Sequence, residues 1–279
     1  MRTVTIAGAT IREALHLPVV HVLVLGAAVL VAIVGQLPRF TMSEQDDLKM
    51  LKDLAVATTT LAGLLIAIFT AANVVTSEIE NWTVVTLLSK PVKRWEFVAG
   101  KWLGLAATVV IAFAALAILV VPAVWWAMWT YAKDWASIGP ELALRFWPNA
   151  WSAADELARG MAMSLLQVLA LTGAATALCV RAPAVVSATA VMTLFVAGNF
   201  ISAAARAADA SGSGLAKAGA FVGGLLIADQ SAIAYSPESA AAAGKMPLEA
   251  LAWAAVYALC FALAGVLAGV LLFRNREVI

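Results

Sequence analysis

Hydrophobic residues in this chain gather into runs long enough to cross a membrane as helices. A helix needs about 20 predominantly apolar residues to span the hydrocarbon core of a bilayer. Six runs reach this length, and an even number of crossings places both termini on the same side. The sequence therefore predicts six transmembrane helices, at residues 17–37, 54–76, 102–129, 160–180, 184–205 and 248–273. A seventh run, 215–228, is shorter and rich in Gly and Ala, which favours an interfacial or re-entrant segment.

The segment ahead of the first run has the pattern of an amphipathic helix. Val4, Ala7 and Ile11 fall on one helical face, whereas Thr10 and Arg12 fall largely on the other. A helix of this kind lies in the headgroup plane with its apolar side toward the lipid. We therefore expect an all-α integral membrane protein of six transmembrane helices with an N-terminal amphipathic interfacial helix.

Composition supports the membrane assignment. Hydrophobic residues make up 63% of the chain, charged residues only 13%, and mean hydropathy is +0.93. Soluble proteins carry about 25% charged residues, so the bilayer is the expected solvent for most of this chain. The net charge of +1 gives no indication of a nucleic-acid partner. We find no soluble domain, and residues 1–279 are interpreted as one membrane domain.

The positive residues give the expected orientation. With the N-terminus inside, the 18 Lys and Arg residues divide equally between the two sides. The inner segments are much shorter, however, and four positive residues cluster at Lys90, Lys93, Arg94 and Lys101. Positive charge is concentrated in cytoplasmic loops, so both termini are predicted to be cytoplasmic. The outer loops are then long, including one at 132–159, and the Ala-rich composition suggests a bacterial inner membrane.

The inner loop at 77–101 carries the strongest functional signal. Two acidic residues, Glu78 and Glu80, precede a short apolar helix, where they complement the helix dipole. Leu87 and Leu88 end this helix, and Pro91 disfavours its continuation. An apolar surface between charges in so short a loop is typical of a docking site for a partner.

The same loop resembles the first cytoplasmic loop of ABC-2 type transporter permeases, and the branch named for multi-copper enzyme maturation is the most similar. The end of the chain, Phe273-Arg274-Asn275-Arg276-Glu277, resembles the terminal aromatic-Arg-x-Arg-acid ending of that family. The likeness in the order of elements covers nearly all of the chain. The residues that match in the loop are Glu78, Glu80, Thr83, Leu87, Leu88, Pro91, Val92, Arg94, Gly100 and Lys101.

This resemblance implies a permease subunit that pairs with a second permease subunit, as a homodimer or a heterodimer, and is served by a cytosolic ABC ATPase. ATP and Mg²⁺ would be bound by that partner, and no cofactor is expected in this chain. Its own Gly100-Lys101-Trp102 lacks the hydroxyl residue and the upstream glycine of a P-loop. The resemblance places the docking of the ATPase on a coupling helix with Glu78, Glu80, Thr83, Leu87, Leu88, Pro91 and Arg94.

Two further patterns leave alternatives open. Thr59, Thr70 and Asn73 share one face of the second span, where they line a translocation path or form ordinary interhelical hydrogen bonds. The sequence from Gly265 to Gly269 is a GxxxG motif, which serves packing within the subunit or a dimer seam. No catalytic or metal-binding pattern is present. The alternative function is a stand-alone carrier or channel, or a structural subunit of a membrane complex.

Overall fold

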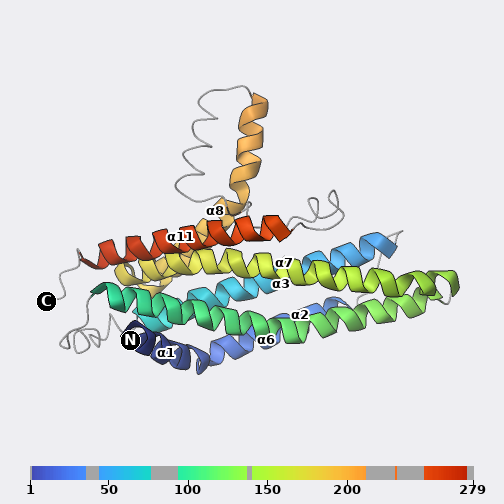
Figure 1. Ribbon diagram of the computed structural model, residues 1–279, viewed down its shortest axis with the longest axis horizontal. Coiled ribbons are helices and arrows are strands. Elements are labelled where there is room, and N and C mark those ends of the chain that lie inside the picture. Colours follow the sequence, from blue (N-terminus) through green and yellow to red (C-terminus); the bar gives the residue numbers. More distant parts are fainter. Residues whose placement is uncertain are drawn as a thin grey trace.

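In a computed structural model, the chain forms a bundle of long α-helices (Figure 1). The structure describes residues 2–35, 44–76, 94–136, 140–211, 230 and 248–274. Within these ranges there is no strand, and the predicted all-α membrane fold is confirmed. The elements are α1 (Arg2–Leu15), α2 (Pro18–Val34), α3 (Glu44–Ala71), the π-helical turn η1 (Ala72–Thr76), α6 (Arg94–Ala136), α7 (Pro140–Arg181), α8 (Ala184–Ser211) and α11 (Leu248–Arg274).

Five of the described helices are long and apolar enough to cross a membrane, and a bent pair provides a sixth crossing if it counts as one span. The pair is α1 and α2, which meet at an angle of 60°. Pro18 begins α2, a position that proline favours because its missing N–H would have no helical partner there. The other five spans are Lys49–Thr76, Trp95–Thr130, Ala154–Arg181, Ala184–Ile201 and Glu249–Phe273.

The centre of the bundle is α7, which packs against α11, α6 and α3, while α1 and α2 lie against α6. Figure 1 shows α11, α7 and α6 side by side, and both termini lie at the left end of the bundle. Helix α8 is the least buried span, and its last part stands out from the bundle. The two termini therefore share one end of the molecule.

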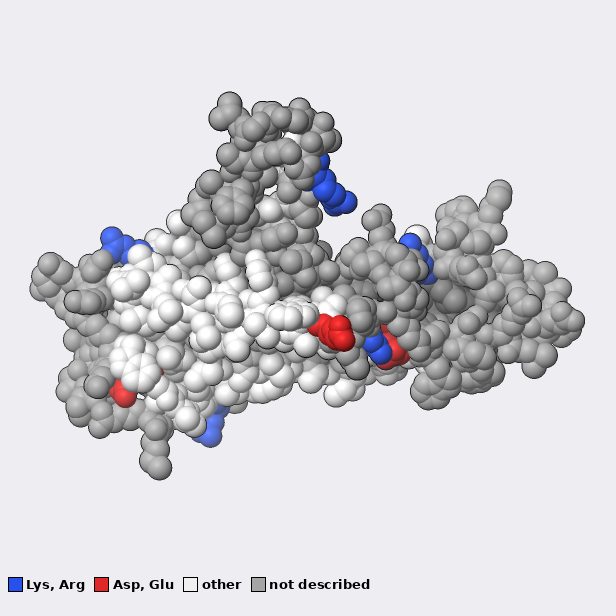
Figure 2. All heavy atoms as spheres, turned by 45° about the horizontal axis from the view of Figure 1, so that its top comes forward, with Lys and Arg blue, Asp and Glu red and all other residues white. Residues whose placement is uncertain are grey.

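Charged residues mark the two sides of the membrane-spanning region. On the body of the bundle in Figure 2, the described Lys, Arg, Asp and Glu side chains lie toward the left end and right of the centre, with an uncharged surface between. On α7, Arg159 and Arg181 bound a stretch without any of these residues. This stretch is about 33 Å long at about 1.5 Å per residue, which matches a hydrocarbon core of about 30 Å.

Helices α6 and α7 extend well beyond this core. They contain 43 and 42 residues, so each is more than about 60 Å long. The expected outer loop at 132–159 is almost wholly helical instead, because α6 continues to Ala136 and α7 already begins at Pro140. A span predicted from apolar length stops where charged residues begin, whereas the helical backbone can continue past that point into water. The two helices form a hairpin at the end opposite the termini (Figure 1).

Helices α3 and α7 run parallel with a constant register. Lys52 forms an ion pair with Glu156 near one end, and the hydroxyls of Thr60 and Ser164 lie 2.7 Å apart and share a hydrogen bond. In both pairs the residue on α7 follows its partner by 104 positions. At the other end, Thr76 lies 3.5 Å from the carbonyl oxygen of Cys179, at a separation of 103 positions. The parallel pair keeps one register through the membrane.

Glycines bring α7 and α11 into close contact. A Cβ atom at Gly265 would lie 2.4 Å from the carbonyl carbon of Gly173, and one at Gly269 would lie 3.1 Å from the Cα atom of Ala177. Small residues let helix backbones approach closely in a membrane. The GxxxG motif of the last span therefore packs within the subunit, which is one of the two alternatives that the sequence left open.

Candidate functional site

The predicted coupling helix lies mostly outside the described residues. Glu78, Glu80, Thr83, Leu87, Leu88 and Pro91 belong to the segment 77–93, whereas Arg94 is the first residue of α6. The structure places the two flanks of this segment. Turn η1 ends at Thr76 and α6 begins at Arg94, both at the end of the bundle that carries the termini. Turn η1 and helix α6 are therefore the elements to which the segment 77–93 is directly attached.

Between these flanks lies a buried lysine. Lys101 on α6 is only 3% exposed, and its Nζ atom donates a hydrogen bond of 3.3 Å to the carbonyl oxygen of Val74 in η1. The same atom lies 3.9 Å from Oε2 of Glu13 on α1 and 5.9 Å from the centroid of the Phe97 ring. A buried cation requires such partners, because burial removes the water that would otherwise solvate it. One ammonium group thus contacts α1, η1 and its own helix.

An aromatic pair ties the same region to the last helix. The rings of Phe97 and Phe273 stack with centroids 5.8 Å apart and an interplanar angle of 28°. Both side chains are fully buried. Phe273 is the first residue of the C-terminal motif, and Lys101 is the last residue of the loop motif. The two motifs that carry the family resemblance therefore meet at one place, which we call the junction and define as Glu13, Val74, Phe97, Lys101 and Phe273.

Helix α1 contacts α6 directly at the junction, more closely than a helix that only lies at the membrane surface would. A Cβ atom at Gly100 would lie 2.9 Å from Cβ of Ile6, and one at Gly104 would lie 2.5 Å from Cβ of Thr10. Thr10, expected on the polar face, is fully buried here. The sequence pattern predicted the apolar side of α1. It did not predict the contact line with α6, where Gly100 and Gly104 leave room for a side chain of α1. Val4, at 68% exposure, remains on the open side of α1.

The three polar residues proposed to line a path do not share one environment. Thr59 and Thr70 are fully buried and donate hydrogen bonds within their own helix, to the carbonyl oxygens of Ala55 (2.8 Å) and Ile66 (2.6 Å). Asn73 is exposed and donates to the carbonyl oxygen of Phe69 at 2.8 Å. The two threonines lie inside the packed bundle in this conformation, and the translocation path stays a prediction.

A polar contact between α7 and α8 joins two other residues of the spans. The Nε2 atom of Gln167 donates a hydrogen bond of 3.2 Å to Oδ1 of Asn199. Asn199 in turn donates to the carbonyl oxygen of Phe195 at 2.8 Å. Side-chain amides in a membrane interior are stabilised by such interhelical bonds. This bond adds a polar contact between α7 and α8 to the apolar packing of Val191 and Phe195.

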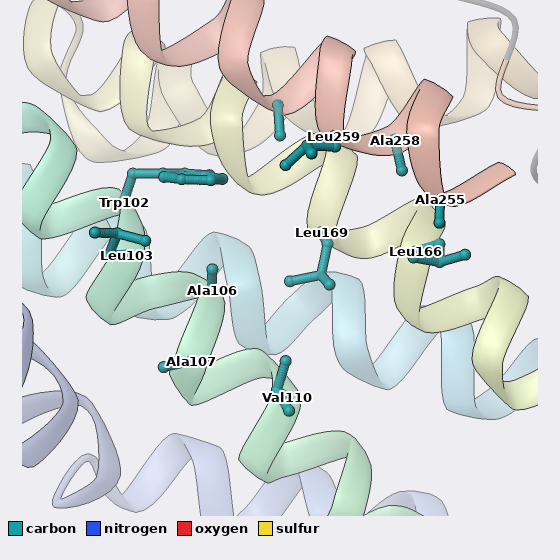
Figure 3. A pocket seen from close by; sticks show the side chains of 11 residues that line it. Trp102, Leu103, Ala106, Ala107, Val110, Leu166, Leu169, Ala255, Ala258 and Leu259 are labelled. Atoms are coloured by element: carbon teal, nitrogen blue, oxygen red, sulfur yellow. The ribbon is translucent and has the colours of Figure 1, made fainter. Parts of the chain in front are cut away.

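An apolar groove lies on the outside of the bundle between α6, α7 and α11 (Figure 3). Its volume is about 460 Å³. Figure 3 shows Trp102 and Leu103 from α6 on one side, Leu166 and Leu169 from α7 behind, and Leu259 from α11 above. Trp102 is the one lining residue with a polar side-chain atom. This groove has no charged group with which to orient a polar ligand.

Among the described residues, no three His, Cys, Asp or Glu side chains come together to hold a metal ion. The two cysteines are free thiols, with Cys179 buried and Cys260 exposed. The contacts of the junction hold α1, η1, α6 and α11 together.

Comparison with known proteins gives the family. No curated protein matches the chain. Residues 6–278 match the family described as ABC-2 family transporter protein, which covers nearly the whole chain. This match begins within α1 and includes the five long spans and all five residues of the junction. The chain belongs to the ABC-2 family of transporter proteins and is a membrane-embedded transporter permease.

Proposed function

We propose that this permease moves its substrate with energy from ATP that a separate cytosolic ABC ATPase hydrolyses. The observation that carries the proposal is the family match over residues 6–278, together with the convergence of the loop motif and the C-terminal motif at the junction. A chain with no phosphate-binding loop in its sequence requires a partner for this work. The ATPase docks on the coupling helix through Glu78, Glu80, Thr83, Leu87, Leu88, Pro91 and Arg94, and two permease subunits form the complete pore.

Purification of the tagged chain from its native membrane tests the proposal. We expect a P-loop ATPase to co-purify and ATP hydrolysis to depend on its presence, while the isolated permease shows none. Substrate transport by the permease alone in vesicles without nucleotide would instead establish a stand-alone carrier.

The docking site has its own test. Replacing Leu87 and Leu88 together with alanine is expected to lower the co-purified ATPase about tenfold or more. Leucines buried at the centre of an interface contribute about 1–3 kcal/mol each, whereas exposed ones contribute almost nothing. Leu267→Ala is a control, because Leu267 is exposed on α11 and lies outside the predicted coupling helix. A lowered melting temperature with unchanged ATPase yield would show that the two leucines only anchor the loop to the bundle.

Orientation is tested by cysteine labelling. Lys93→Cys is expected to react with a membrane-impermeant maleimide only after cells are permeabilised, because the basic cluster places this loop in the cytosol. Lys49→Cys, at the opposite end of the bundle and exposed, is expected to react in intact cells. Labelling of Lys93→Cys from outside would reverse the proposed orientation.

A further inference from the structure

Lys101 occupies a position where a lysine is rarely found. It is 3% exposed on a helix that crosses the membrane, and neighbouring turns of the same buried stripe carry Phe97, Leu105 and Val109. An ionisable side chain in such a stripe costs stability, and a residue that served packing alone would be apolar. Because a buried lysine costs stability, we expect Lys101 to have a role that an apolar side chain could not fill.

The contacts of Lys101 indicate that role. Lys101 lies on α6, the first helix after the segment 77–93. It donates a hydrogen bond to Val74 in η1, the last turn before that segment. The elements before and after the segment are thereby joined by a hydrogen bond that does not pass through the segment. Glu13 extends the same connection to α1.

We propose that Lys101 is a positioning residue that makes α1, η1 and α6 move as one body when the ATPase displaces the segment 77–93. The inference rests on the proposed function, because it requires an ATPase at that segment. It adds one residue, Lys101, through which a displacement of the segment 77–93 moves α1, η1 and α6 together.

The chemistry of a lysine suits this role. An ammonium group offers three donors on a flexible four-carbon stem, so it can keep its bond to a carbonyl oxygen while neighbouring groups shift. The Glu13 side chain is 46% exposed, and water can replace it as a partner during movement. The Val74 and Phe97 contacts are buried, so they hold when the Glu13 contact opens.

The test compares Lys101→Met with Lys101→Arg in the complete complex of permease and ATPase. Methionine preserves length and apolar packing but removes the donor, whereas arginine preserves a charged donor. Spin labels at Ala9 on α1 and Val185 on α8, both exposed, report the distance between α1 and the rest of the bundle. Exposed Cys260 is replaced with Ser in this background, and buried Cys179 is kept. Lys52→Met is the matched control, since Lys52 pairs with Glu156 at the opposite end.

We expect a nonhydrolysable ATP analogue to change the label distance in the wild-type complex and in Lys52→Met. The change is lost in Lys101→Met and restored in Lys101→Arg, with ATPase yield equal in all four proteins. An unchanged response in Lys101→Met, or no response in the wild-type complex, overturns the inference. Loss of the ATPase from Lys101→Met also overturns it, because Lys101 would then support docking or folding. If the wild-type permease recovers no ATPase at all, the proposed function itself fails.

Discussion

Replacing Gly173 with alanine is expected to lower the free energy of unfolding by about 3 kcal/mol, the upper end of the range for overpacking in a core. A Cβ atom at this position would lie 2.4 Å from the carbonyl oxygen and 2.7 Å from the Cα atom of Ala262. These are backbone atoms of α11, so no side-chain rotation relieves the clash. Helices α7 and α11 must move apart, and the contact between them is the most extensive in the bundle.

Thermal unfolding in detergent, followed by the fraction of protein that remains monodisperse, measures this loss. Gly26→Ala is the matched control, because a Cβ atom there meets nothing within 4 Å. Alanine is also the better helix former, so this control should retain its stability. Equal melting temperatures for Gly173→Ala and Gly26→Ala would show that α7 and α11 are not in direct backbone contact.

The second large effect is expected at Gly63 on α3. A Cβ atom at Gly63 would lie 2.2 Å from Cε2 of Phe113 on α6, a ring that is itself buried. Gly63→Ala is therefore expected to destabilise the protein by about 2–3 kcal/mol, because the ring has no free space in a close-packed interior.

At Gly63 the clashing group is the side chain of Phe113, so a second substitution can remove the clash. Phe113→Leu removes the atoms that clash, and the double variant Gly63→Ala with Phe113→Leu is expected to be more stable than Gly63→Ala alone. Phe113→Leu alone leaves a small cavity and is expected to cost about 1 kcal/mol. Additive losses in the double variant would contradict the contact, because residues that touch show a measurable interaction energy.

Much of the fold follows from the sequence because the bilayer imposes a length on apolar runs. The runs at 54–76, 160–180 and 248–273 fall within α3 with η1, α7 and α11, respectively. The same criterion could not give the true ends of α6 and α7. Hydropathy reports where lipid begins, whereas a helix ends where its backbone loses hydrogen-bond partners or meets a breaker. The residues that extend these two helices mix charged side chains with aromatic and small apolar ones, so they were interpreted as a loop.

The junction was only partly predictable. Lys101 and Phe273 were singled out through family resemblance, but their meeting around Phe97 depends on how α6 and α11 pack. One signal in the sequence could have located the buried lysine. Phe97, Lys101 and Leu105 recur at intervals of four, so the lysine interrupts an otherwise apolar helical stripe. The glycines at 100 and 104 could likewise have indicated the seam with α1, but their partners on α1 are distant in the chain.

The parallel register of α3 and α7 restricts how this bundle can rearrange. A slide of one helix along the other by a single turn, about 5 Å, would separate Lys52 from Glu156 and Thr60 from Ser164 at the same time. Since both pairs have the same offset, no intermediate displacement preserves one of them. Shear between these helices is therefore opposed by two polar contacts together. For the Thr60–Ser164 pair, which lies inside the membrane, a lost partner is not replaced by water.

Rotation of α3 and α7 as a unit breaks neither pair. Because α7 is also joined to α11 through Gly173 and Gly265, a torque on α3 at the end that leads into the segment 77–93 turns a slab of three helices. Beyond the membrane, α7 continues for about 28 Å from Arg159 to Pro140. A tilt of a few degrees in the slab thus moves the hairpin tip sideways on the far side, because the part of α7 beyond the membrane is nearly as long as the part within it.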